Sequence, residues 1–301
     1  MRIVALFGPT GVGKTAVALS LADLLRERGE DPVAVSADAL QVYADLEVLT
    51  GAASAAEQAR LEHRLISFLP VQETFSAGRY AQLAHAEIDS LLAAGRRPIV
   101  LGGTGLYLRA ALCELDLRPP VPVELRDRWR RALEQEGAPA LHARLALLAP
   151  AAAAEVDPND RHRIARALEL LELGERPPQR EEGDSQLWSE ELRRPTTLIG
   201  LTMDRAELYA RIDARVQEMV AAGAREEVLR AQQQGASETA RKALGFAALL
   251  EDDVEAMKRD TRRYARRQLT WMRKLAGVRT IDVTGREPSA VAAEILDSGP
   301  L

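Results

Sequence analysis

The first half of the chain alternates short apolar runs with amphipathic segments. Four apolar runs predict strands, at residues 1–7, 32–36, 63–68 and 98–101. The segments at 16–28 and 77–94 have the spacing of amphipathic helices. Apolar residues are consecutive in most of these runs, which is typical of parallel strands covered on both faces. This half therefore predicts an α/β fold with a parallel sheet.

The pattern changes after Asp116, where three prolines occur within four residues. Helical spacing follows at 124–135, 139–148 and 161–173, and the polar residues 179–194 predict a loop. An apolar run at 197–201 predicts a further strand of the core. The rest of the chain is predicted to be helical, with helices at 205–222, 225–233, 242–251 and 254–275. We therefore expect an α/β core formed by residues 1–116 and 195–301, with helices in its C-terminal region and a helical insertion at 117–194.

A phosphate-binding sequence lies between the first strand and the first helix. Residues 8–15 read Gly-Pro-Thr-Gly-Val-Gly-Lys-Thr, which is the G-x-x-x-x-G-K-T phosphate loop in its required setting. Backbone N–H groups of such a loop bind an anion, the lysine adds positive charge and the threonine hydroxyl ligates Mg²⁺. We therefore expect a core like that of the P-loop NTPases. The residues expected to bind a diphosphate or a triphosphate are Gly8, Pro9, Thr10, Gly11, Val12, Gly13, Lys14 and Thr15, with Thr15 as the metal ligand.

Two other predicted strands also end in polar residues. Asp38 follows the strand at 32–36, and Thr104 lies in a glycine-rich turn after the strand at 98–101. Ligands of open parallel sheets bind at the carboxyl ends of the strands, so both are expected near the phosphate loop. From spacing alone, Asp38 is a Mg²⁺ ligand, a general base or a helix N-cap. Thr104 is either a group that positions a substrate or a capping residue.

The composition excludes disulfide-stabilised and membrane-spanning proteins. The formal net charge is −5, and the single cysteine, Cys113, excludes an intramolecular disulfide framework. No apolar run reaches the roughly eighteen residues of a membrane span, so we expect no membrane partner. A reducing, cytoplasmic setting is the natural expectation.

Positive charge is concentrated in one predicted helix of this acidic chain. Residues 258–274 hold eight basic residues and one acidic residue. Arginines 259, 262, 266 and 273 recur there at helical spacing, and few acidic residues adjoin them in sequence. We therefore expect these side chains to contact nucleic-acid phosphates rather than carboxylates.

Together these segments resemble the tRNA dimethylallyltransferases, also called tRNA isopentenyltransferases. The resemblance rests on the phosphate loop, on Ser-Ala-Asp-Ala-Leu-Gln-Val-Tyr at 36–43 and on Gly-Gly-Thr-Gly-Leu-Tyr-Leu at 102–108. Three further segments follow in the family's order, at 158–169, 243–246 and 263–271. One segment departs from the family, which often carries a lysine where residues 48–53 read Val-Leu-Thr-Gly-Ala-Ala. No substrate contact is therefore expected there.

The resemblance implies transfer of a dimethylallyl group from dimethylallyl diphosphate to N6 of adenosine 37, beside the tRNA anticodon. It implies Mg²⁺ as cofactor, the tRNA anticodon stem-loop as partner, and catalytic roles for Asp38 as general base, for Thr104 and for Lys14. The implied tRNA-binding residues are Asp38, Ala39, Leu40, Gln41, Thr104, Arg126, Arg163, Arg166, Arg262, Arg266 and Arg267. We expect a monomer.

Other functions share some of these features. An adenylate isopentenyltransferase acting on free nucleotides would need the same phosphate loop, Asp38 and Thr104. A small-molecule P-loop kinase would need ATP, and a binding module without activity would leave Asp38 and Thr104 without a role. The basic helix and the helical insertion favour a macromolecular acceptor.

Overall fold

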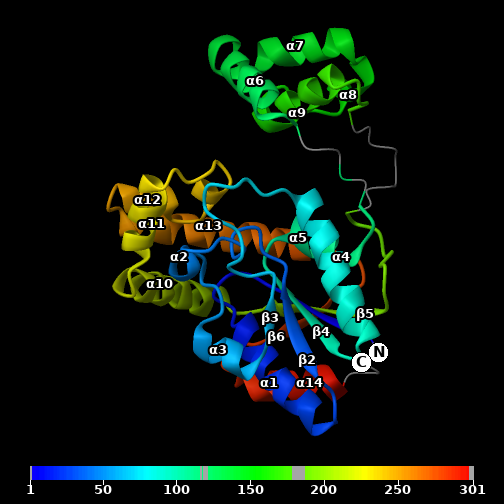
Figure 1. Ribbon diagram of the computed structural model, residues 1–301, viewed down its shortest axis with the longest axis vertical. Coiled ribbons are helices and arrows are strands. Elements are labelled where there is room, and N and C mark those ends of the chain that lie inside the picture. Colours follow the sequence, from blue (N-terminus) through cyan, green and yellow to red (C-terminus); the bar gives the residue numbers. More distant parts are fainter. Residues whose placement is uncertain (1, 116, 118–120, 178–186, 298–301) are drawn as a thin grey trace. The chain divides into compact units, whose positions relative to one another are not determined.

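The computed structural model describes residues 2–115, 117, 121–177 and 187–297, and the chain forms two compact units (Figure 1). The first unit comprises Met1–Leu117 and Gln186–Leu301, and the second comprises Arg118–Ser185. The expected insertion ended later, at residue 194. Residues after 186 lie with the first unit because Trp188 packs against Trp271 and Arg193 pairs with Asp89. None of the described helices is both long enough and apolar enough to cross a membrane.

A six-stranded parallel sheet forms the centre of the first unit, with the strand order β3-β2-β4-β1-β5-β6. The strands are β1 (Ile3–Phe7), β2 (Pro32–Ser36), β3 (His63–Arg64), β4 (Arg97–Gly102), β5 (Thr196–Thr202) and β6 (Arg279–Asp282). The expected α/β class is confirmed.

Two strands differ from the predictions. The strand expected at 63–68 stops after Arg64, because Leu65 and Ser67 adopt positive φ angles of 60° and 48° that turn the chain away. β6 lies in a region expected to be helical. Only Ile281 of its four residues is buried, so the segment has no apolar run that sequence reading could detect.

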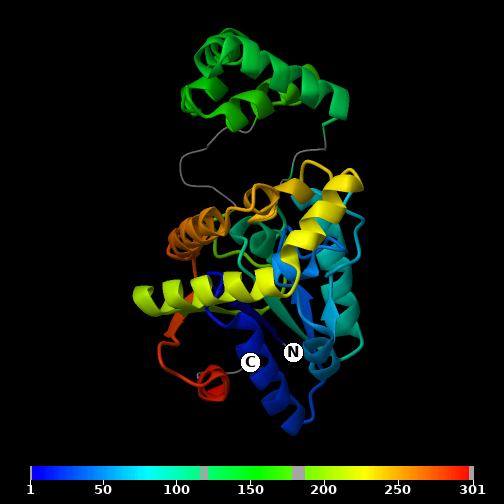
Figure 2. The ribbon, with the colours of Figure 1, turned by 90° about the vertical axis from the view of Figure 1, so that its left-hand side faces the viewer.

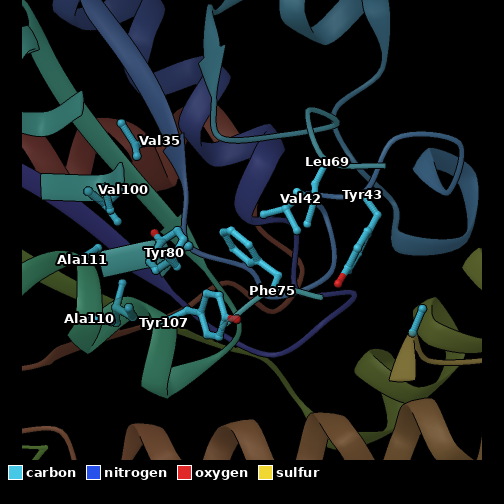
Figure 3. Close-up of a cluster of buried hydrophobic side chains, with 14 of the residues drawn as sticks. Val35, Val42, Tyr43, Leu69, Phe75, Tyr80, Val100, Tyr107, Ala110 and Ala111 are labelled. Carbon is cyan, nitrogen blue, oxygen red and sulfur yellow. The ribbon is translucent and has the colours of Figure 1, made fainter. Parts of the chain in front are cut away.

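Alternate residues of the strands face two separate apolar clusters. Ile3, Ala5 and Phe7 join one cluster, while Val4 and Leu6 join the other. The first cluster is covered by α4 (Ala77–Ala93) and α5 (Gly105–Leu112), whose Tyr80 and Tyr107 pack beside strand residues Val35 and Val100 (Figure 3). On the opposite face α1 (Lys14–Glu27) and α14 (Pro288–Asp297) lie side by side (Figures 1 and 2).

Among its described residues, the first unit has seven further helices. They are α2 (Glu47–Thr50), α3 (Ala55–Arg60), α10 (Arg205–Ala221), α11 (Ala224–Gln233), η1 (Ala240–Lys242), α12 (Phe246–Leu250) and α13 (Val254–Met272). The single helix expected at 242–251 is divided, because Gly245 adopts a φ of 92° between η1 and α12. α13 packs against both α10 and α5.

Helices are the only regular secondary structure among the described residues of the second unit. It contains α6 (Val123–Glu136), α7 (Ala138–Leu148), α8 (Pro150–Ala154) and α9 (Arg161–Glu172). Its own core is built from Trp129, Leu133, Leu141, Leu145, Ile164 and Leu168. The three helices expected here are therefore present, and α8 was not predicted.

Candidate active site

The three loops singled out in the sequence follow neighbouring strands. β4 pairs with β1 on one side and with β2 on the other. Because the strands are parallel, the phosphate loop, Asp38 and Thr104 all lie at the same edge of the sheet. The fold therefore places these candidates together, and their individual roles remain predictions.

The phosphate loop leaves the first amides of α1 available to a ligand. The backbone N–H of Val12 donates to the carbonyl of Pro9 at 3.3 Å, which closes the turn. Gly13 precedes the helix with a φ of 96°, a conformation that favours glycine. It supplies no side-chain cap, so the first N–H groups of α1 have no capping bond from it and are available to an anion.

Lys14 has an unusually acidic ammonium group. Its Nζ donates to the carbonyls of Gly8 at 2.9 Å and Pro9 at 3.0 Å. Loss of hydration, followed by repulsion from Arg215, lowers the pKa of Lys14 to about 8, although the Asp38 carboxylate acts in the opposite direction. Two cations thus lie near one another beside the phosphate loop, an arrangement that a polyanionic ligand would stabilise.

The Asp38 side chain stabilises a turn and does not cap a helix. Its Oδ1 accepts from the backbone N–H groups of Leu40 at 2.9 Å and Gln41 at 3.4 Å, and no helix begins at these residues. The N-cap interpretation is therefore wrong. Its Oδ2 accepts no hydrogen bond from the described residues, so this half-buried oxygen is free to act on a substrate or a cation.

Gln41 uses both of its amide atoms within the protein. Its Oε1 accepts from the Ser36 hydroxyl at 3.0 Å, and its Nε2 donates to the Gly51 carbonyl at 3.2 Å. These bonds hold the 38–43 turn against the segment that departs from the family. The second N–H of Nε2 and the second lone pair of Oε1 remain for a ligand, and the expected tRNA contact of Gln41 stays a prediction.

Thr104 faces α13. It precedes α5 without capping it, so the capping interpretation is wrong. Its Oγ1 lies 3.1 Å from the hydroxyl of Tyr264 on α13. Burial, followed by the nearby Asp38 carboxylate, raises the pKa of Tyr264 to about 12, so the phenol keeps its proton near neutral pH and can orient Thr104.

Comparison with known proteins identifies the family. A family model described as IPP transferase matches residues 41–275. A tRNA dimethylallyltransferase from Kineococcus radiotolerans is 40% identical over 312 aligned positions, which cover 99% of this chain and 96% of that protein. One from Anaeromyxobacter dehalogenans is 41% identical and covers 98% of this chain and 99% of that protein. The chain belongs to the IPP transferase family.

A solved structure supports the same assignment. The full-length tRNA isopentenylpyrophosphate transferase from Bacillus halodurans has a TM-score of 0.69 and 32% identity, covering 98% of this chain and 94% of that one. The resemblance inferred from the ordered motifs is thereby confirmed.

The structure corrects one expectation about the basic helix. Arg262 of α13 pairs with Asp213 of α10, with Nη1 lying 2.5 Å from Oδ1, and Arg259 lies 3.6 Å from Asp253. Sequence spacing could not show this partner for Arg262, because Asp213 is distant along the chain. Arg266 and Arg267 are exposed, and Arg267 lies over the ring of Tyr264, with its guanidinium carbon 5.5 Å from the ring centroid.

The insertion arginines lie on two helices of the second unit. Arg126 is on α6 and donates to the carbonyl of Val121 at 3.4 Å, while Arg166 on α9 lies 3.5 Å from Glu169. Burial raises the pKa of the Glu169 carboxyl. The positive charges of Arg166 and Arg126 oppose this effect but do not cancel it. The exposed Arg163 lies 3.3 Å from Asp160. tRNA binding by these three arginines stays a prediction.

Two residues at the site were not among the sequence candidates. The positive charge of Arg215 on α10 lowers the pKa of Lys14, and its Nη2 donates to the carbonyl of Gly51 at 3.4 Å. Gln268 of α13 contacts both the phosphate loop and the loop after β4. Both come from helices far along the chain from the phosphate loop. Gln268 lies within the family segment at 263–271, but that segment does not show which loops it contacts, and Arg215 lies in none of the family segments singled out.

Proposed function

We propose that this chain transfers a dimethylallyl group from dimethylallyl diphosphate to N6 of adenosine 37, beside the tRNA anticodon, and releases diphosphate. The observation that carries the proposal is the position of Asp38 near Lys14, at the edge of the sheet that bears the phosphate loop, with an Oδ2 that accepts no hydrogen bond from the described residues. Membership of a family whose relatives are named tRNA dimethylallyltransferases supports it.

The phosphate loop is suited to the leaving group. Negative charge grows on the diphosphate as the allylic C–O bond breaks, and cations placed there stabilise that change. Lys14, Arg215 and the first amides of α1 supply this charge. Binding of the anion would draw the Lys14 ammonium away from the carbonyls of Gly8 and Pro9.

The residues present also fit Mg²⁺. The described residues contain no cluster of three or more metal-binding side chains, but Mg²⁺ at phosphate sites commonly takes one or two protein ligands and completes its shell with substrate oxygens and water. Thr15, at the start of α1, would hold the ion together with diphosphate oxygens and water. When bound, it would neutralise charge on the diphosphate.

Asp38 is the group best placed to activate the acceptor. The N6 lone pair of adenine is delocalised into the ring, so N6 attacks C1 of the dimethylallyl group more readily if a carboxylate accepts one of its protons. Oδ1 maintains the turn while Oδ2 remains for this proton. The Thr104 hydroxyl, oriented by Tyr264, would position the adenine.

The acceptor belongs to a macromolecule in this proposal. An adenine that reaches a strand edge must leave its stack, and RNA-binding enzymes obtain such bases from single-stranded loops. Exposed arginines on α13 and basic residues on α6 and α9 supply charge for the phosphates of an anticodon stem-loop.

The test is a reaction with defined acceptors. Purified protein, Mg²⁺ and labelled dimethylallyl diphosphate are incubated with tRNA, with the same tRNA carrying guanosine at position 37, or with AMP. We expect N6-modified adenosine and diphosphate only with the unchanged tRNA, and no requirement for ATP. Modification of AMP instead would indicate an adenylate isopentenyltransferase. An ATP requirement with ADP as product would indicate a kinase and contradict the proposal.

A further inference from the structure

A single buried amide joins the phosphate loop to the loop after β4. Gln268 of α13 is 4% exposed. Its Oε1 accepts from the backbone N–H of Thr10 at 2.8 Å, and its Nε2 donates to the backbone carbonyl of Gly103 at 2.7 Å. Both partners are main-chain atoms, so the bonds fix the paths of the two loops.

The loops joined by this amide leave little space between them. A Cβ atom added to Gly103 would overlap Nε2 of Gln268 and would lie 3.4 Å from the carbonyl oxygen of Gly8. A Cβ atom added to Gly102 would lie 2.7 Å from the carbonyl oxygen of Ala37, which precedes Asp38. The backbones that carry the diphosphate site, Asp38 and Thr104 are therefore in close contact, and a shift of Gln268 would move two of them.

The same helix reaches this edge at a second point. Tyr264 lies one helical turn before Gln268 on the same face, and its hydroxyl is 3.1 Å from that of Thr104. Arg266 and Arg267 lie between these residues in sequence and are exposed. One side of α13 thus holds the substrate loops while another side presents positive charge to solvent.

We propose that Gln268 is a positioning residue that couples RNA binding on α13 to the spacing between the phosphate loop and the Gly103–Thr104 loop. The inference rests on the proposed function, since it assigns the two loops to the diphosphate and the adenine. RNA that engages Arg266 and Arg267 restrains α13. Through the two bonds of Gln268, this restraint fixes the distance between the group that leaves and the group that attacks.

Two variants and a control test the role. Q268M has nearly the same length and loses both bonds, whereas Q268E keeps an acceptor for the Thr10 amide and can donate to Gly103 only when its new carboxyl is protonated. T261V is the control, because Thr261 is equally buried on α13 but its hydroxyl donates only to the Met257 carbonyl of its own helix. All variants are measured in the full chain, with the melting temperature recorded.

Binding is measured with inorganic diphosphate in the presence of Mg²⁺, with and without the tRNA anticodon stem-loop. In the wild type and in T261V we expect RNA to tighten diphosphate binding by about fivefold or more, the lower end of common coupling between sites. In Q268M this effect should vanish while RNA alone binds within about twofold of wild type. We also expect kcat to fall by about a hundredfold, as displacement of reacting groups by an ångström can cause.

The pH profile of Q268E separates positioning from simple destabilisation. Burial raises the pKa of an introduced carboxyl. Transfer activity of Q268E relative to wild type should therefore rise as the pH falls from 8 to 6, because protonation restores the bond to Gly103. The same ratio for T261V should stay flat.

Three outcomes would overturn the inference. The first is a wild type whose diphosphate affinity is unchanged by RNA, and the second is a Q268M variant that retains the coupling. The third is a Q268E variant whose activity relative to wild type does not change with pH. If Q268M does not fold, the Q268E ratio decides. A wild type that modifies no tRNA would contradict the proposed function instead, and the diphosphate and RNA titrations would still report on the coupling.

Discussion

At the scale of single residues, Lys14 and Asp38 have different expected effects. Lys14→Ala removes a cation from the leaving-group site, so diphosphate affinity and kcat should fall together. Asp38→Asn keeps an oxygen for the turn bonds to Leu40 and Gln41 but loses the base. We expect it to bind dimethylallyl diphosphate normally and to transfer about a hundredfold more slowly. Calorimetry and single-turnover kinetics measure the two effects.

The matched control for this pair is Asp45→Asn. Asp45 is exposed with a φ of 65°, a conformation that asparagine tolerates, so the change should be silent. If Asp38→Asn abolishes Mg²⁺-dependent diphosphate binding and spares transfer at saturation, Asp38 is a metal ligand rather than the base.

The acidity of Lys14 predicts a pH dependence of binding. Desolvation and Arg215 lower its pKa to about 8, so the ammonium form exists below that pH and is lost above it. Affinity of the free enzyme for dimethylallyl diphosphate should therefore be full below pH 8 and decline above it. Arg215→Gln removes the repelling cation and should move the decline to higher pH. Calorimetric titration from pH 6.5 to 9.5 measures both, and Lys14→Ala serves as the control that lacks the decline.

At the scale of elements, α13 carries the clearest prediction about RNA. Reversal of Arg266 or Arg267 to Glu should weaken tRNA binding and leave diphosphate binding unchanged, because these exposed side chains supply counter-charge to phosphates. The slope of log affinity against log salt should become shallower by about 0.7 to 0.9 for each RNA phosphate that the variant no longer neutralises. Binding measured across a salt series provides the slope.

The choice of residues and control for that experiment follows from the structure. Arg262 is left out because its reversal would place a carboxylate against Asp213 and disturb the packing of α10 on α13. Arg28→Glu is the control, since Arg28 is exposed at the end of α1 farthest from the phosphate loop. Equal slopes for all variants would mean that this face of α13 is only solvated.

At the scale of the whole molecule, the two units have separate cores. No described residue of 121–177 belongs to either apolar cluster of the sheet. Replacement of residues 118–185 by a short Gly-Ser linker should therefore leave the first unit folded, with diphosphate affinity within about threefold of the full chain. Transfer to tRNA should be lost, because Arg126, Arg163 and Arg166 are removed. Thermal unfolding and diphosphate titration test the first expectation, and the transfer assay tests the second.

A different result would change the assignment of the RNA surface. If the shortened chain still modifies tRNA at an undiminished rate, the insertion does not contribute to acceptor binding and α13 alone carries it. If the shortened chain fails to fold, the independence of the two cores is wrong.

The sequence by itself determined the parts of this protein that depend on local pattern. Consecutive apolar residues predicted the buried parallel strands, and the glycine and lysine spacing of residues 8–15 predicted the phosphate loop, because both signals lie within a few neighbouring residues. Strand β6 escaped detection because only Ile281 is buried. The ordered motifs were sufficient to indicate the family.

Only the tertiary structure decided which side chains act on which. Because α10 packs beside α13, Asp213 pairs with Arg262. Arg215, also on α10, lies close enough to Lys14 to lower its pKa. Gln268 lies 258 residues from Thr10 along the chain, yet they share a hydrogen bond. Contacts of this kind arise from the arrangement of whole elements around the sheet, and residue spacing within one element carries no information about them.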